Sequence, residues 1–122
     1  MAKLEEREGV RMEKRVEMNR LLDFYGALLT EHRRDVMRAY LEEDLSLQEI
    51  ADNMCITRQG VHDAINKAQK QLMEYENKLG LLSRYQKLQK AVVQGKEALQ
   101  EGSPESIQRA TEILNSIIDI ER

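Results

Sequence analysis

The chain has 122 residues, of which 41% are hydrophobic, 34% charged and 4% aromatic, with a single proline. This length fits one domain, and the shortage of aromatic residues argues against a protein rich in strands, so we expect an all-α fold. The formal net charge of −3 argues against a protein that coats nucleic acid through its overall charge.

No stretch approaches the ~18 consecutive apolar residues of a membrane span, so we expect no transmembrane segment. The first eight residues also lack the apolar run of a secretory signal. Cys55 is the single cysteine of the sequence and cannot form a disulfide within the chain. These features together predict a cytoplasmic protein.

The N-terminal third is predicted to hold an arm and two helices. Residues 1–15 carry dense alternating charge and are expected to be a mobile arm or the solvated start of a helix. A helix is expected over 16–29, where apolar residues recur three and four positions apart. Thr30 is predicted to cap a second helix that reaches Glu43 and stops there, because acidic residues oppose the dipole at a helix C-terminus.

The centre of the chain has the pattern of a helix-turn-helix corner. Ser46 and Glu49 have the spacing of a capping box, which predicts a short helix to about Asn53. Thr57 is expected to cap the next helix, and Ala51 supplies the small residue that a steep crossing of two helices needs. The sequence therefore predicts a corner of two helices joined by a short turn.

The C-terminal half is predicted to contain one long helix and two more. The helix after Thr57 runs to Gly80, and another is expected over 82–100. Gly102 and Ser103 then end one helix and cap the next, with a proline at its first position. The apolar stripes of the last two helices predict packing into the core or, as the rival, the seam of a homodimer. We therefore predict three regions: a mobile arm at 1–15, a helix-turn-helix domain at 16–80 and a C-terminal helical extension with a dimerisation role at 81–122.

The helix after Thr57 carries polar side chains long enough to reach base edges and phosphates. Arg58 is suited to read guanine, and Gln59 or Asn66 to read adenine. Lysines further along would contact phosphates, which position a protein without specifying a sequence. The predicted nucleic-acid-binding residues are Arg58, Gln59, His62, Asn66, Lys67 and Lys70.

Charge along the chain favours this interpretation, whereas two residues oppose it. Residues 57–90 hold seven basic and three acidic side chains, while the segments on either side are net acidic. Cys55, however, lies where such turns usually carry glycine for a positive φ. Asp63 places a carboxylate on the presumed DNA side, although an acid can accept a hydrogen bond from cytosine. The alternative is a protein-interaction module that uses the corner as a scaffold without binding nucleic acid.

Catalysis and metal binding find little support in the sequence. His32 and His62 lie on different predicted helices, and with Cys55 their spacing fits no zinc pattern. A lone cysteine in a turn is more often packed than reactive, and no glycine-rich phosphate loop exists. We therefore expect no enzyme activity, no metal and no cofactor.

Two family resemblances follow from these motifs. The stretch 29–72 resembles the region-4 domain of bacterial sigma factors, with the Ser-x-x-Glu-Ile-Ala core at Ser46 to Ala51. A closer resemblance, over about residues 12–90, is to the YlxM family of small bacterial helix-turn-helix proteins. The segments that carry it are 18–25, 28–30, 46–51, 57–63 and 74–79, with Thr57 where that family usually shows serine.

The resemblance implies both a fold and a cellular setting. The implied fold is a sigma region 4-like helix-turn-helix bundle with a long helix and a C-terminal helical extension. Genes of the YlxM family lie beside those of the signal recognition particle, which implies a regulatory or accessory role in that protein-targeting pathway. The implied partners are DNA, or the RNA or protein of the particle, together with a second copy of the chain.

Overall fold

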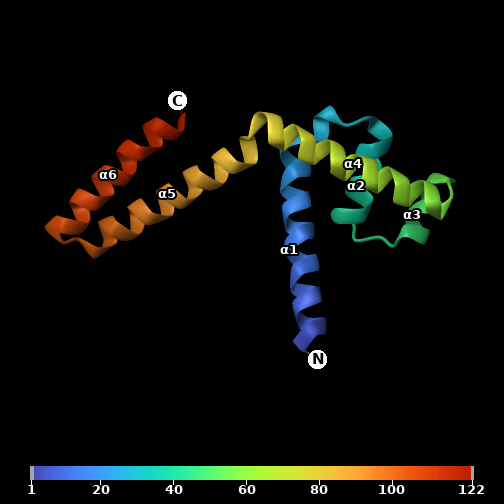
Figure 1. The fold of residues 1–122 in the computed structure, drawn as a ribbon, viewed down its shortest axis with the longest axis horizontal. Helices are drawn as coiled ribbons and strands as arrows, with labels where there is room; N and C mark the ends of the chain where they lie inside the picture. Colours follow the sequence, from blue (N-terminus) through green and yellow to red (C-terminus); the bar gives the residue numbers. More distant parts are fainter. Residues whose placement is uncertain (1, 122) are drawn as a thin grey trace. The chain divides into compact units, whose positions relative to one another are not determined.

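The computed structural model describes the backbone of residues 2–121 and the side chains of residues 12–120. Over this part of the chain the fold is all α-helical and has no strand, as the sequence predicts (Figure 1). None of the helices described is long and apolar enough to cross a membrane. The elements are α1 (Ala2–Tyr25), η1 (Gly26–Leu28), α2 (Glu31–Leu41), α3 (Leu47–Met54), α4 (Arg58–Leu79), α5 (Leu81–Glu101) and α6 (Pro104–Glu121).

The chain divides into two compact units, Met1–Leu79 and Gly80–Arg122, called unit 1 and unit 2 below. In unit 1, α4 is the central helix, because α1, α2 and α3 all pack against it (Figure 1). Every one of these helices contributes fully or almost fully buried apolar side chains to one core, including Leu21, Met37, Ile50, Val61 and Leu72. This core holds the helix-turn-helix corner in place.

The helix boundaries in unit 1 differ from the predictions at three points, the first being that the helix expected over 16–29 ends at Tyr25 and is followed by the 3-10 turn η1. Helix α1 begins at Ala2 rather than near residue 16. Of the two predictions for 1–15, the start of a helix therefore agrees with the backbone. The mobility predicted for 1–15 stays a prediction, and the side chains of 1–11 lie outside the described part. Helix α2 is capped by Thr30 as predicted but ends at Leu41, two residues before Glu43. The chain turns there because Leu45 N–H donates to the Ala39 carbonyl at 3.1 Å.

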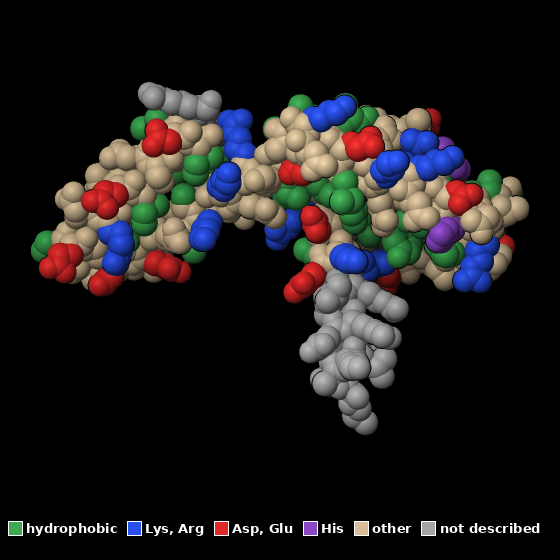
Figure 2. All heavy atoms as spheres, in the orientation of Figure 1, with side chains coloured by type: hydrophobic (Ala, Val, Ile, Leu, Met, Phe, Trp, Pro, Cys, Tyr) green, Lys and Arg blue, Asp and Glu red, His purple; other side chains and the backbone are tan. Residues whose placement is uncertain are grey.

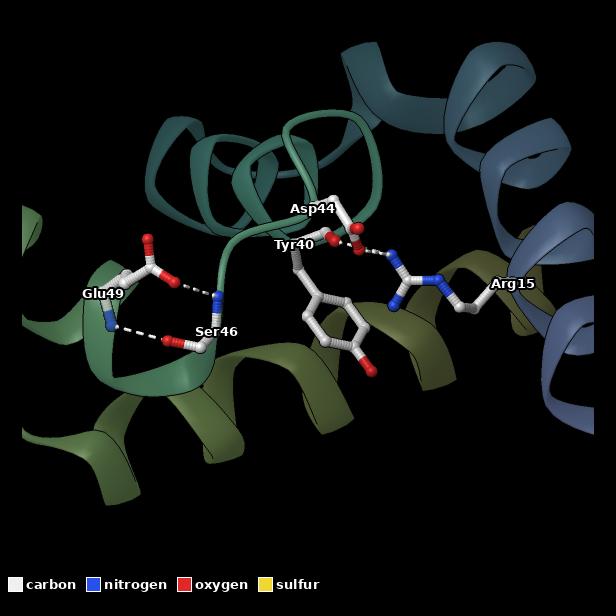
Figure 3. A network of polar contacts seen from close by, with 5 residues as sticks. All are labelled: Arg15, Tyr40, Asp44, Ser46 and Glu49. Atoms are coloured by element: carbon white, nitrogen blue, oxygen red, sulfur yellow. Dashed lines mark hydrogen bonds and ion pairs between the residues drawn. The ribbon is translucent and has the colours of Figure 1, made fainter. Parts of the chain in front are cut away.

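Arg15 of α1 binds the C-terminal end of α2 through hydrogen bonds (Figure 3). Its Nη2 donates to the Tyr40 carbonyl oxygen at 2.9 Å and to Asp44 Oδ1 at 3.0 Å. The guanidinium carbon also lies 4.7 Å from the centre of the Tyr40 ring. Because the last carbonyls of a helix lack partners within it, this arginine satisfies one of them from a neighbouring helix. It thereby positions the loop that leads into α3.

A tyrosine pair joins α1 to the second half of α4. Tyr25 is fully buried, and its hydroxyl donates to Glu76 Oε1 at 2.7 Å. Its ring lies 6.0 Å from the ring of Tyr75, between centres. Two of the segments that carry the family resemblance, 18–25 and 74–79, therefore meet in space.

Unit 2 is a hairpin of α5 and α6. Gly102 has φ +75, a left-handed conformation that glycine adopts readily, and Ser103 caps α6 by accepting from Ser106 N–H at 3.1 Å. Most of the buried residues of this hairpin are small, among them Ala91, Gly95 and Ala98.

The expectation that the apolar stripes of unit 2 pack into a core holds for Leu82 but is wrong for several other large members. Six branched side chains stay between 47% and 56% exposed, because two helices alone cannot enclose both flanks of each stripe. They are Val92, Val93, Leu99, Ile107, Leu114 and Ile118.

Candidate nucleic-acid interface

Two helix caps, which together make three hydrogen bonds from side chain to backbone, frame the helix-turn-helix corner. Glu49 N–H donates to Ser46 Oγ at 3.1 Å, and Ser46 N–H donates to Glu49 Oε1 at 3.3 Å, which completes the predicted capping box (Figure 3). At the start of α4, Thr57 Oγ1 accepts from Gly60 N–H at 2.9 Å. Ala51 is only 2% exposed, as expected for a small residue where α3 crosses α4. The predicted corner is therefore confirmed.

The turn between α3 and α4 is strained at Cys55. This residue ends α3 in the left-handed conformation, with φ 55 and ψ 41. A residue with a Cβ pays roughly 1–2 kcal/mol for that conformation, which is why glycine is usual there. The positive φ that the sequence led us to expect at Cys55 is therefore present, and the corner forms in spite of it.

The six predicted binding residues are all exposed and all lie on α4, between Arg58 and Lys70. Their helix buries its other side, through Val61, Ala64 and Ile65, against the core of unit 1. The outer side is therefore open to a partner along three turns. Figure 2 shows basic, acidic and histidine side chains close together over this end of unit 1.

Several of these side chains hold one another in place. Gln59 Nε2 donates to Asp63 Oδ1 at 3.0 Å, and Asn66 Nδ2 lies 3.3 Å from His62 Nδ1. These pairs are four residues apart, the spacing at which side chains meet on a helix. Asp63 therefore engages the amide of Gln59 and keeps a carboxylate in the middle of the outer side.

A shallow basic groove of about 380 Å³ lies beside the outer side of α4, between α2 and α4. Lys67 and Lys70 line it and so belong to both surfaces. Arg33 joins them from α2, where its Nη1 donates to Gln71 Oε1 at 2.8 Å. The full lining is Arg33, Lys67, Lys70, Gln71, Glu74, Tyr75 and Lys78. Four of these seven side chains are cationic and one is acidic, which favours an anionic partner such as a phosphate backbone.

Two cationic residues of this groove, Arg33 and Lys78, are not among the binding residues predicted from the sequence. Lys78 follows Lys70 and Glu74 at steps of four residues, so helical spacing alone could have placed it on the same side of α4. Arg33 belongs to another helix, and only the packing of α2 on α4 brings it near the lysines. The groove is therefore a feature of the fold rather than of any local motif.

No cluster of three or more metal-binding side chains occurs among the described residues. His32 lies on α2 and His62 on α4, and both are exposed. Cys55 is a free, exposed thiol. The described geometry therefore brings together no set of side chains that would hold a metal ion.

Comparison with known proteins points to one family. Residues 12–115 match the model of the UPF0122 family, described as "Putative helix-turn-helix protein, YlxM / p13 like". A UPF0122 protein of Clostridium botulinum is 46% identical over 90 residues, which cover 74% of this chain and 83% of the relative. A UPF0122 protein of Desulforamulus reducens is 39% identical over 108 residues, covering 84% of this chain and 91% of the relative. A relative from Bacillus mycoides is 44% identical over 90 residues, with coverage of 74% and 82%.

Proposed function

Because the chain belongs to the YlxM / p13-like family of helix-turn-helix proteins, we propose that it is a non-enzymatic regulatory protein that binds nucleic acid through α4. The observation that carries this proposal is the continuity of two surfaces. The outer side of α4 is open along its first three turns, and the basic groove continues it through shared lysines, Lys67 and Lys70. A duplex lying on α4 would therefore meet cations on one flank of the recognition helix.

The proposed roles follow from side-chain chemistry. Arg58 would read guanine and Asn66 would read adenine, because each side chain can form a pair of hydrogen bonds to that base. Lys67 and Lys70, with Arg33 and Lys78, would neutralise phosphates and fix the register without reading sequence. Gln59 and His62 complete the contact set from the first turns of α4.

The proposed setting is the signal recognition particle pathway of a bacterial cytoplasm. This proposal is supported by membership of the YlxM-like family, because the resemblance to that family implies a role in this pathway. The partner would be promoter DNA or the RNA of the particle. We propose also that the chain works as a homodimer, because two copies present two recognition helices at a fixed spacing, as two-fold symmetric DNA sites require.

Fluorescence polarisation with a duplex DNA and with a structured RNA, each at low and moderate salt, tests the nucleic-acid part. For a chain that binds duplex DNA, log K should fall with log salt by ~0.9 for each phosphate neutralised. The double variant Lys67→Gln with Lys70→Gln should therefore weaken binding and lower this slope by ~1.8. The matched control removes two lysines of unit 2, by Lys87→Gln with Lys90→Gln, and should leave the affinity and the slope unchanged. Absence of binding, or binding without salt dependence, contradicts the proposal.

A second candidate function is a protein-interaction module that retains the corner as a scaffold. It is favoured by Asp63, whose carboxylate occupies the amide of Gln59 and would repel a phosphate. Asp63→Asn separates the two candidates, because removal of this charge should strengthen nucleic-acid binding if α4 lies on a duplex. A pull-down with the GTPase subunit of the particle, with and without Arg58→Ala plus Lys67→Ala, tests the protein partner. Loss of nucleic-acid binding with an intact protein partnership would show that the two activities are separable.

A further inference from the structure

Apolar side chains of the α5–α6 hairpin recur at the spacing of bundled helices. On each helix the steps alternate between three and four residues, which places a stripe along one side. The positions are Leu88, Val92, Gly95 and Leu99 on α5, and Ile107, Ala110, Leu114 and Ile117 on α6. Gly95 and Ala110 are buried, whereas Val92, Leu99, Ile107 and Leu114 stay 47–54% exposed. The larger members of a bundle-like stripe are thus open to solvent.

The exposed members of both stripes lie on one face of the hairpin. Each directly follows a residue turned toward the other helix, as Leu99 follows Ala98 and Ile107 follows Ser106. When two right-handed helices pack antiparallel, the residue that follows a contact position points to the same side of the pair on both helices. We call this surface the hairpin face, and it consists of Val92, Leu99, Ile107, Leu114 and Ile118.

The other face of the hairpin is polar, which makes the unit amphipathic as a whole. A groove there is lined by Gln94, Glu97, Glu101 and Arg109 along with two side chains of the interhelical seam. Arg109 Nη2 lies 2.7 Å from Glu101 Oε2. One face of unit 2 is therefore suited to water and the other to an apolar partner.

The size of the hairpin face matches a protein interface. Five half-exposed branched side chains form a patch on the order of 400 Å², within the range of the largest apolar patches on monomers, which are often functional. From Ile107 to Ile118 the face extends eleven residues along α6, which is roughly 16 Å. With helix axes 8–10 Å apart, a patch of this length fits within the ~800 Å² that each partner contributes to a standard interface, and the polar rim supplies the remaining area.

The rim of the hairpin face indicates a second copy as the occupant. Its outer neighbours on the two helices are Gln89, Lys96, Thr111 and Asn115, all exposed. Lys96 is the single charged residue among these four, so a strongly charged partner would find few opposite charges at the rim. A second copy brings an apolar face and a largely neutral rim of the same kind, with no cluster of like charges opposed.

We infer that the hairpin faces of two copies pack on each other about a two-fold axis and close a four-helix bundle. Such an interface is self-complementary, because the same residues are contributed from both sides. The inference rests on the proposed dimer and specifies the surface that forms it. It assigns to unit 2 the role of association and leaves the outer side of α4 to nucleic acid.

Sedimentation velocity and light scattering of the full chain at micromolar concentrations test the inference. The wild-type chain should have twice the 14.2 kDa mass of one copy, and Leu114→Glu should reduce it to 14.2 kDa with an unchanged helical circular dichroism signal. The matched control is Leu28→Glu in unit 1, because Leu28 is 52% exposed and Leu114 is 53% exposed. This control should remain a dimer.

Two outcomes overturn the inference in distinguishable ways. A wild-type chain of 14.2 kDa at every concentration removes the dimer as well as its surface. A Leu114→Glu variant that stays dimeric removes only the surface. If this variant loses helical signal, hydrogen exchange of the wild-type chain decides: protection of α5 and α6 must rise with concentration while that of α3 stays constant. Polarisation on the same samples scores nucleic-acid binding independently, so its failure is not confused with failure of the hairpin face.

Discussion

The two units use apolar residues in different ways. Unit 1 has a core of large ones, with Met37, Ile50 and Leu72 fully enclosed among α4 and the three helices packed on it. Unit 2 buries mainly small residues such as Ala91 and Ala98 and leaves six branched ones about half exposed. Similar helical patterns thus give a closed core where three helices surround a fourth, and an open face where only two helices meet. The comparison teaches that periodicity specifies which face is apolar, while the number of packing layers decides whether that face is buried.

The units also differ in their polar contacts between distant segments. Unit 1 has hydrogen bonds between helices far apart in the sequence, such as Tyr25 to Glu76 and Arg33 to Gln71. In unit 2 Arg109 pairs with Glu101 across the two helices, and both of these side chains are 59% exposed. Exposed pairs of this kind contribute little to stability. Unit 1 is therefore expected to hold its shape alone, and unit 2 to depend more on association.

The largest expected effect is a cavity in unit 1. Leu72→Ala removes a fully buried side chain from α4 and should lower the free energy of unfolding by about 3 kcal/mol. Urea denaturation followed by circular dichroism measures the change. Leu114→Ala in unit 2 removes the same atoms from a half-exposed site and should cost under ~1 kcal/mol in a dilute sample. Equal losses would contradict the contrast between a closed and an open unit.

The buried tyrosine gives the next largest effect. Tyr25→Phe keeps the ring contact with Tyr75 and removes the hydroxyl that donates to Glu76, so it should cost about 1.5 kcal/mol. Glu76→Gln is the matched variant, because it keeps an acceptor oxygen without the charge, and it should lose less than half as much. Hydrogen exchange measured by mass spectrometry should show faster exchange in α1 and α4 than in the wild-type chain, with unit 2 unchanged. Faster exchange in unit 2 alone would break the assignment of this bond to unit 1.

Most of the fold can be predicted from the sequence where local chemistry decides. The caps at Thr30, Ser46 and Thr57 were predicted from spacing and are confirmed, because a capping side chain acts within one helical turn. Helix α1 was expected to start near residue 16 because apolar periodicity begins there, but charged residues are good helix formers and extend a solvated helix without it.

The candidate site is less predictable, because part of it is assembled from distant segments. The six residues on α4 share one helix, so a single pattern finds them, and their role stays a prediction. Arg33 enters the same surface from α2 and could be found only once the packing of α2 on α4 was known. Nor could periodicity tell that Leu114 stays exposed, since burial depends on how many helices surround α6.

The strained turn of unit 1 gives a prediction of opposite sign. Cys55→Gly relieves the left-handed conformation and should raise the free energy of unfolding by about 1 kcal/mol. Cys55→Ala is the control, because it removes the thiol and keeps the Cβ, and it should leave stability nearly unchanged. Thermal unfolding of the three proteins under reducing conditions measures the difference. A stabilised alanine variant would show that the thiol, rather than the backbone conformation, is responsible.

The smallest expected effect concerns where unit 1 begins. Arg15 lies at the end of the segment predicted as a mobile arm, yet it contacts Tyr40 and Asp44. Its ion pair with Asp44 is worth little, because the two side chains are 33% and 88% exposed, so most of its contribution should come from the Tyr40 carbonyl and ring. Arg15→Ala should therefore cost about 0.5–1 kcal/mol, and Asp44→Asn less than ~0.5 kcal/mol, in urea denaturation. If Arg15→Ala costs nothing, α1 contributes to unit 1 only from residue 16 onward, and the boundary predicted from periodicity is the energetic one.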